Sequence, residues 1–272
     1  MTVRSLPPIL CHKEHDEASV FSPENLLREA RRQRDIPSGK VPEICVLDPD
    51  GDIVRNLIEQ NKCFLNPHWA CYHSKLYDFE MDGMTFGIVG CAVGSSFAVL
   101  VAEELFASGC QFLISVTSAG QIRPLDKLPY FVVIEKASRD EGTSYHYLPA
   151  SEYSEMGGLC LNMIKDAFRQ SPVSVCFGVT WTTDAPFRET AKAIESYRKK
   201  GICAVEMEAA ALYAFSKAKK KNVICFAHVT NEMGKGSGDF EKGAAGGSKD
   251  ALAVISITAQ KWLSTRDMKP EK

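Results

Sequence analysis

The sequence predicts an α/β protein, a single three-layer domain in which helices flank a twisted, mixed and largely parallel sheet. Short apolar runs typical of buried strands alternate with helical stretches along the chain. The length of 272 residues suits one large domain, and 45% hydrophobic residues are enough for its core. We expect an N-terminal extension over residues 1–43, the α/β domain over 44–265 and a tail over 266–272.

The first predicted element is a helix in the N-terminal extension. Ser22 is a typical N-cap, and Pro23 fits the first turn because its missing N–H needs no partner there. This helix continues to Arg34. The apolar run 44–47 then predicts the first buried strand, and an Asp-rich turn leads into a helix over residues 53–60.

The next strand and helix are separated by a short loop. Residues 86–90 form an apolar run that predicts a strand. After the loop, Ser95 and Ser96 offer N-caps for a helix over residues 97–108, and Gly109 ends it.

The rest of the chain continues the alternation. Apolar runs predict strands over 112–116, 130–136, 173–179, 201–205 and 223–229. Helix-forming stretches predict helices over 208–221, with Asn222 as its stop, and over 251–263. Between them, the glycine-rich segment 234–247 lacks the spacing of a phosphate loop, so we expect a lid or a plain loop.

Composition excludes several classes of function. The net charge is -2, with 32 basic and 34 acidic residues, which does not suit nucleic-acid or membrane binding. No apolar stretch is long enough for a membrane span, and residues 1–10 lack the apolar core of a signal peptide. We therefore expect a cytoplasmic protein.

Ten cysteines and six histidines show neither a C-x-x-C pair nor metal-ligand spacing. We expect no metal site and interpret most cysteines as reduced, buried small hydrophobes. The alternative for Cys91 is a nucleophilic thiol, which needs an electropositive setting.

Two carboxylates occupy the junction between the apolar run 201–205 and the following helix. Glu206 and Glu208 lie where open α/β sheets bind ligands, at the carboxyl end of a strand. The alternative is that both are ordinary first-turn acids that complement the helix dipole.

The motif Val205-Glu206-Met207-Glu208-Ala209 resembles the ribose-binding signature of the nucleoside phosphorylase family, which includes uridine and purine nucleoside phosphorylases and related nucleosidases. The segments 117–120 and 183–187 extend the resemblance, which runs from about Val46 to the C-terminal helix. It implies a nucleoside phosphorylase-like fold, with Met207 packed on the sugar and Glu208 accepting from the 2′- and 3′-hydroxyls. It also implies a small-molecule nucleoside ligand, no cofactor, and a homo-oligomer that is a dimer or a ring of dimers.

Further site residues follow from the resemblance. Ser118, Ala119 and Gly120 match a segment that contacts the sugar and the group that attacks it, although a tight turn also needs small residues. Asp184 matches an acid beside the base pocket. Phe187 falls where the family places a residue against the nucleobase, and core packing is its alternative.

Three other assignments depend on weaker matches. Arg188 can reach a base carbonyl or solvent. In the family, a histidine near the N-terminus binds the ribose 5′-hydroxyl in the site of the neighbouring subunit. His12, or His15, stands at the matching distance from the N-terminus. The polar and aromatic loop 139–147 resembles the uridine phosphorylase branch and suits a pocket or a subunit interface.

The chain departs from the family where phosphorylases hold phosphate. The expected arginines are missing, and the first turn carries Asp48, Asp50 and Asp52 instead. Nucleosidases have an acid there that activates water, so Asp52 is our first choice of general base, with Asp50 or Asp48 as substitutes. The alternative is that these aspartates form an Asx-type turn and cap the next helix.

The resemblance therefore favours hydrolysis of the N-ribosidic bond. Asn231 stands where nucleosidases have a proton-donating Asp, and an amide can donate a hydrogen bond but no proton. Phosphorolysis, with phosphate as co-substrate, is the alternative if Arg123, Arg139 or Arg188 rebuilds an anion site. A nucleoside-binding sensor without turnover is the non-enzymatic alternative.

Overall fold

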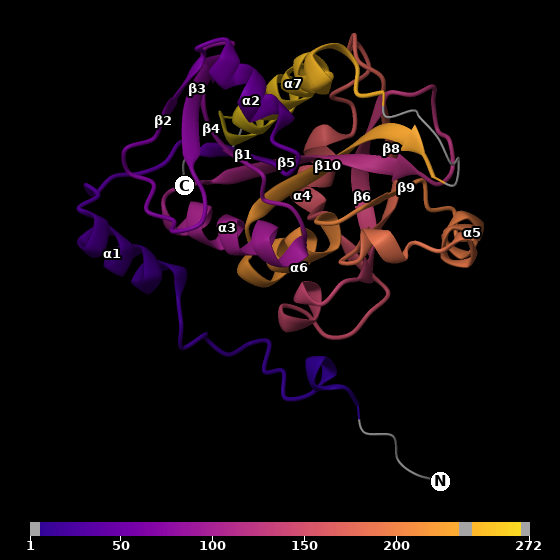
Figure 1. Ribbon diagram of the computed structural model, residues 1–272, viewed down its shortest axis with the longest axis horizontal. Helices are drawn as coiled ribbons and strands as arrows, with labels where there is room; N and C mark the ends of the chain where they lie inside the picture. Colours follow the sequence, from indigo (N-terminus) through magenta and orange to yellow (C-terminus); the bar gives the residue numbers. More distant parts are fainter. Residues whose placement is uncertain (1–5, 234–240, 268–272) are drawn as a thin grey trace.

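A computed structural model describes residues 6–233 and 241–267 of the chain (Figure 1). Its strands are β1 (Ile44–Asp48), β2 (Cys63–Leu65), β3 (Leu76–Met81), β4 (Met84–Gly90), β5 (Phe112–Gln121), β6 (Tyr130–Asp140), β7 (Tyr153–Glu155), β8 (Val175–Thr183), β9 (Ala204–Glu206) and β10 (Asn222–Glu232). Its α-helices are α1 (Pro23–Arg34), α2 (Asp52–Glu59), α3 (Ser95–Ala107), α4 (Gly158–Ile164), α5 (Ala191–Lys199), α6 (Ala209–Lys219) and α7 (Ser248–Asp267).

The strands form one mixed sheet in the order β10-β6-β8-β9-β5-β1-β4-β3-β2, with β7 paired to β6. Because β10 also pairs with β5, the strands β5, β10, β6, β8 and β9 close into a ring. Parallel pairing joins β1 to β4 and β5, and β5 to β10, so these strands end on the same side of the sheet.

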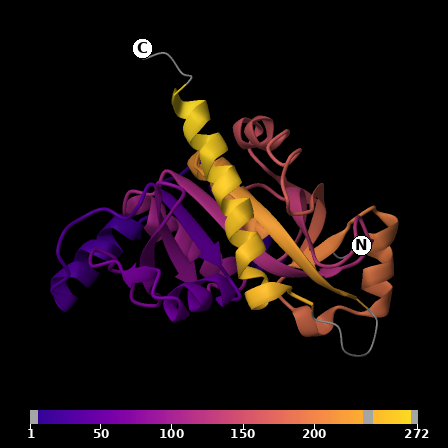
Figure 2. The same ribbon diagram turned by 90° about the horizontal axis from the view of Figure 1, so that it is seen from above.

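Helices cover both faces of this sheet. On one side α2 and α4 contact α7, which crosses the sheet in Figure 2. On the other side α3 contacts both α1 and α6, and α6 packs on β6 and β10. In Figure 1, α2 and α7 lie above the sheet while α3 and α6 lie below it. The predicted three-layer α/β fold is confirmed.

Several predicted boundaries differ from the structure. Strand β8 begins and ends later than predicted, and β5 continues through the polar segment to Gln121. Helix α6 ends before Lys220 because that residue takes a left-handed φ of 54°. Helix α7 continues to Asp267, past the predicted end of the domain at residue 265.

The predicted N-caps of α3 were wrong. Gly94 is the N-cap, with a φ of 84°, and no side chain caps the helix. The hydroxyl of Ser95 instead donates to the carbonyl of Met207 at 2.7 Å. The first turn of α3 is thereby tied to the loop before α6.

The cysteines are all free, and most lie in the core as predicted. Burial raises the pKa of the Cys160 and Cys203 thiols to about 11, which leaves them protonated and unreactive near neutral pH. Cys91 is exposed in the loop after β4.

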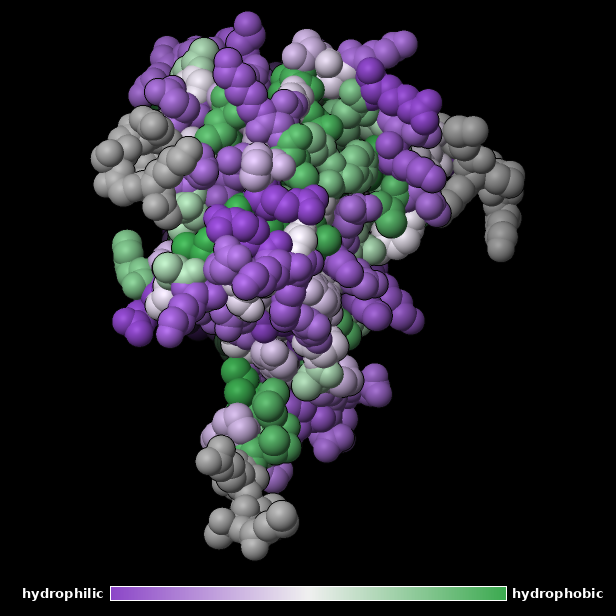
Figure 3. Space-filling model, turned by 90° about the vertical axis from the view of Figure 1, so that its right-hand side faces the viewer, coloured by the Kyte–Doolittle hydropathy of each residue, from purple (hydrophilic) through white to green (hydrophobic). Residues whose placement is uncertain are grey.

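An N-terminal arm, residues 6–22, precedes α1; it contacts the loop after β6 and forms a narrow protrusion at one end of the molecule (Figure 3). Val20 is fully exposed, and the side chains of Leu6 and Phe21 are more than half exposed. Among the helices that the structure describes, none has the length and apolar character needed to cross a bilayer.

Candidate active site

The turn after β1 carries the three aspartates, and each has a different role. Asp48 is 1% exposed, and its carboxylate accepts from the backbone N–H groups of Gly51 at 3.1 Å and Val54 at 2.9 Å. It therefore holds the turn and caps α2, which was the structural alternative predicted for this segment. Burial raises its pKa to about 7.

Asp50 points to residues 118–120 of β5, the segment that is predicted to contact the sugar and is called the sugar-site segment below. One carboxylate oxygen accepts from the Ser118 backbone N–H at 2.7 Å, and the other accepts from the Ser118 hydroxyl at 2.8 Å. Its side chain is 30% exposed. A partly exposed carboxylate held in this way can face a small ligand.

Asp52, the predicted general base, lies in the first turn of α2 and is paired with two cations. It contacts the guanidinium of Arg55 and the ammonium of Lys242. Partial burial opposes ionisation, but the hydrogen bonds from Lys242 and Arg55 outweigh it and lower the pKa of Asp52. A carboxylate with a lowered pKa is a weak base.

Lys242 was not recognised from the sequence. It belongs to the glycine-rich segment 234–247, of which residues 234–240 lie outside the described part of the chain. Its Nζ also stands 3.9 Å from a carboxylate oxygen of Asp50. This lysine places a positive charge directly beside the acidic turn.

Glu206 and Glu208 are both buried between β9 and α6, but they bond to different groups. Glu206 accepts from the hydroxyls of Thr180 and Thr182 and from the backbone N–H groups of Glu208 and Ala209. With four donors inside the chain, this carboxylate positions the start of α6.

Glu208 has fewer internal partners. Its carboxylate is 1% exposed and accepts from the Gly94 N–H at 2.7 Å and from the Met207 N–H at 3.3 Å. Burial, followed by repulsion from Glu206, raises its pKa to about 8, and a hydrogen bond from the Thr117 side chain opposes the shift. Thr117 precedes Ser118 on β5, so Glu208 and Asp50 contact neighbouring residues of one short segment.

A small cavity lies beside this segment. Its wall is formed by the acidic turn, β5, β10 and the start of α7, and its lining includes Asp48, Asp50, Asp52, Thr117, Ser118, His228, Gly246 and Gly247. The space open to the centre of a water molecule is about 10 Å³, which is room for about one water. His228 is a member of this site that the sequence analysis missed.

Gly120 and Asn231 meet at the far end of the segment. They are strand partners on β5 and β10, after an irregularity in the register between Val229 and Asn231. A side chain at Gly120 would collide with the sulfur of Met233, because a Cβ there would stand 2.2 Å from it. Ala119 is buried beside them, and the amide of Asn231 points to the same sulfur at 3.8 Å.

The residues predicted for the base do not line the acidic cavity. Asp184 is exposed and accepts from the Gly142 N–H at 2.8 Å. Phe187 is 99% exposed, so its core-packing alternative is wrong, and Arg188 is exposed in the same short 3-10 helix. Their contact with a base remains a prediction.

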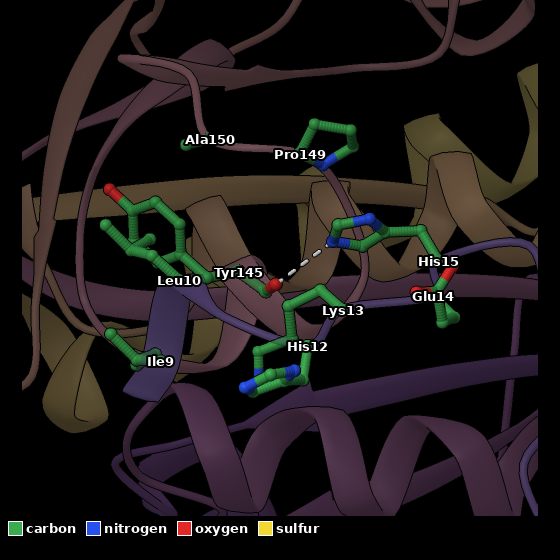
Figure 4. A pocket seen from close by; sticks show the side chains of 9 residues that line it. All are labelled: Ile9, Leu10, His12, Lys13, Glu14, His15, Tyr145, Pro149 and Ala150. Atoms are coloured by element: carbon green, nitrogen blue, oxygen red, sulfur yellow. Dashed lines mark hydrogen bonds between the residues drawn. The ribbon is translucent and has the colours of Figure 1, made fainter. Parts of the chain in front are cut away.

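His12 lies in a separate pocket on the N-terminal arm (Figure 4). The arm supplies His12 and His15, and the loop after β6 supplies Tyr145, whose carbonyl is 3.2 Å from the His15 Nε2. His12 does not line the acidic cavity of its own chain. Its predicted role in a neighbouring subunit remains a prediction.

Arg139 was one of three arginines considered for a rebuilt anion site. It is 5% exposed, and its guanidinium donates to Ser144, Ser151 and the carbonyls of Leu148 and Pro149. This arginine therefore holds the loop after β6. Within the described residues, no group of three or more His, Cys, Asp or Glu side chains is arranged to hold a metal ion.

The buried acids predict how the stability of the fold depends on pH. Glu208 and Asp48 keep their protons in the folded state at pH values where the unfolded chain releases them. The free energy of unfolding should therefore fall as pH rises from about pH 4, to about pH 7 through Asp48 and to about pH 8 through Glu208, by up to about 1.4 kcal/mol per pH unit per group. Urea denaturation across this range measures the slope. Glu208→Gln should flatten it, the exposed Glu59→Gln should not, and a rise with pH would contradict the assignment.

Comparisons with known proteins agree with the predicted resemblance. The family model described as the phosphorylase superfamily matches residues 43–258. Uridine phosphorylase of Thermococcus kodakarensis is 26% identical over 196 residues, which are 65% of this chain and 69% of that protein. Guanosine phosphorylase of Halorubrum lacusprofundi is 24% identical over 190 residues, 69% of this chain and 73% of that protein.

Solved structures show the same fold. Uridine phosphorylase from Vibrio fischeri superposes with a TM-score of 0.65 at 22% identity, covering 83% of this chain and 92% of that one. Purine nucleoside phosphorylase from Toxoplasma gondii, in complex with immucillin-H, gives a TM-score of 0.69 at 16% identity, covering 84% of this chain and 93% of that one.

Proposed function

Because the chain belongs to the phosphorylase superfamily, we propose that it cleaves the N-ribosidic bond of a nucleoside, and that it does so by hydrolysis. The observation that carries this proposal is the contact between Asp50 and Ser118. Ser118 offers its N–H and its hydroxyl at the segment that, in the family, faces the attacking group. Both donors are already bound to the Asp50 carboxylate, at 2.7 and 2.8 Å.

An internal carboxylate at this position disfavours phosphate. Asp50 takes the donors that an anion would need, and its negative charge repels a phosphate dianion. The adjacent cavity has room for about one water molecule, as its volume of about 10 Å³ for water centres indicates. The Asp50 charge and the size of the cavity support water as the nucleophile.

The proposed reaction uses Glu208 and Asp50, which contact the neighbouring residues Thr117 and Ser118 of β5. Glu208 accepts from the ribose 2′- and 3′-hydroxyls, while Met207 packs on the sugar. As the bond from C1′ to the base nitrogen breaks, positive charge develops on the ribose ring, and the Asp50 carboxylate stabilises it. Water then forms the new bond to C1′ and passes a proton to Asp50; the departing base takes up a proton from solvent, and Asp50 returns its proton to solvent.

We therefore place the general base at Asp50 rather than at Asp52. Asp50 faces the sugar-site segment, and its ion pair with Lys242 is long, at 3.9 Å. Asp52 shares its charge with Lys242 and Arg55.

Phosphorolysis is the second candidate, and the two cations favour it. Lys242 and Arg55 stand at the turn after the first strand, close to where phosphorylases of the family bind phosphate. A phosphate would have to displace Asp52 from both of them. The cost of breaking these contacts makes phosphorolysis the less favoured reaction.

The product distinguishes the two reactions. We expect a nucleoside panel to release free base and ribose at equal rates in phosphate-free and phosphate-containing buffer, as measured by chromatography of base and sugar. Ribose 1-phosphate formed only with phosphate would establish phosphorolysis instead. Binding without release of base would identify a sensor.

A further inference from the structure

His228 lies in a row of side chains that crosses three strands and ends at the acidic turn. On β10 it is the register partner of Phe131 on β6 and of Ser118 on β5. Register partners on adjacent strands direct their side chains to the same face of a sheet. The row therefore runs from Phe131 through His228 to Ser118, which holds Asp50.

The imidazole ring is fixed in place on both sides. It stacks on Phe131 with ring centroids 4.4 Å apart and an interplanar angle of 4°. On another side it packs against Gly247, where a Cβ would stand 2.2 Å from the His228 Cε1. Only a glycine fits at that position, and its φ of 78° also requires one.

The ring lines the cavity, with Cε1 and Nδ1 on the side of Gly247, and it has no hydrogen bond to any group among residues 6–233 and 241–267. Its charged neighbours are Lys242, Asp50, Asp52 and Asp250. Burial, followed by repulsion from Lys242, lowers the pKa of His228 to about 4. Near neutral pH the ring is therefore uncharged, with one nitrogen that donates and one that accepts.

We propose that His228 is a positioning residue that holds the attacking water together with Asp50, an inference that rests on the proposed hydrolysis. A confined water needs two to four polar partners. Asp48 is engaged in capping α2, and Asp52 is paired with Lys242 and Arg55. Among the described titratable side chains of the cavity, Asp50 and the His228 ring are the pair left to hold a water between them.

In this arrangement His228 stays neutral throughout the reaction. It makes one hydrogen bond to the water, the water proton passes to Asp50, and a lone pair of the water oxygen forms the bond to C1′. Two fixed partners orient that lone pair before the sugar becomes electrophilic. Loss of one partner should misplace the nucleophile without weakening the contact of Glu208 with the ribose.

The test uses His228→Phe, which keeps an aromatic ring on Phe131 but removes both nitrogens. We expect kcat to fall about 100-fold, with KM and the melting temperature unchanged. His228→Gln, which restores a hydrogen-bonding group, should recover at least part of this loss. Unchanged kcat in His228→Phe would overturn the proposal, as would a loss that His228→Gln does not relieve.

Competition between water and methanol provides a second readout of how the nucleophile is held. If His228 selects and orients water, the ratio of methyl riboside to ribose should rise about tenfold in His228→Phe. His228→Leu also lacks the nitrogens. If His228→Phe does not fold, the ratio of methyl riboside to ribose is measured on His228→Leu instead. An unchanged ratio overturns the role of His228.

The wild-type product separates this proposal from the proposed function. If the wild type forms ribose 1-phosphate alone, hydrolysis fails, and the water-holding role of His228 fails with it. If the wild type forms ribose and either His228→Phe readout is unchanged, only the role of His228 is overturned.

Discussion

Asp50→Asn is expected to lower kcat for nucleoside hydrolysis by about 10²- to 10⁴-fold, because it removes the group that takes the proton from water. The amide oxygen can still accept from Ser118, whose N–H and hydroxyl hold Asp50 at 2.7 and 2.8 Å in the wild type. The fold and the nucleoside affinity should therefore change little. Steady-state kinetics together with a thermal melt measure both effects.

Asp52→Asn is the matched control for this prediction. It alters the neighbouring carboxylate, which is bound to Lys242 and Arg55 instead of facing the sugar-site segment. We expect a smaller loss of kcat than for Asp50→Asn. A larger loss in Asp52→Asn would return the role of base to Asp52, the residue that the sequence favoured.

Glu208→Gln is expected to lower kcat/KM for ribonucleosides by about 10²- to 10³-fold. Hydrogen bonds to a charged group contribute about 1.5–3 kcal/mol each, and the carboxylate would accept two from the ribose. For the same reason the wild type should disfavour 2′-deoxynucleosides by about 10- to 100-fold. Equal turnover of ribo- and 2′-deoxyribonucleosides by the wild type would refute the assignment.

The pH profile provides a second measurement on the same residue. The pKa of Glu208 in the free protein is about 8, so the ionised form that accepts from both hydroxyls increases as pH rises through that value. We expect kcat/KM of the wild type to rise toward pH 8. The kcat/KM of Glu208→Gln should not rise with pH in this range. Glu206→Gln is the comparison, because Glu206 is held by four internal donors and its loss should mainly lower the melting temperature.

The fold and part of the site could be predicted because their signals are local. The apolar runs that form β1, β4, β5 and β10 are continuous and buried on both faces. The elements that were missed lack such a signal. Strand β2 is mostly exposed, and α5 has Ile194 as the single buried residue of its described span, so neither element contains a long apolar run.

The remaining site residues depend on tertiary pairing that spacing cannot show. Gly51 takes a φ of 74°, and the shape of that turn decides which of the neighbouring aspartates faces Ser118. Lys242 and His228 are single residues in segments without a motif. They join the site only because the start of α7 and strand β10 close around the acidic turn.

The closed ring of strands has a consequence for the precision of the site. A shift of one residue in the register of a strand turns its side chains to the opposite face, which would move His228 away from Ser118. In an open sheet a single strand can slip in this way. Here β10 is held between β5 and β6, and these are linked to each other through β8 and β9. A slip of β10 would have to be matched around the whole ring, so the alignment of His228 with Ser118 is enforced by the topology as well as by side-chain packing.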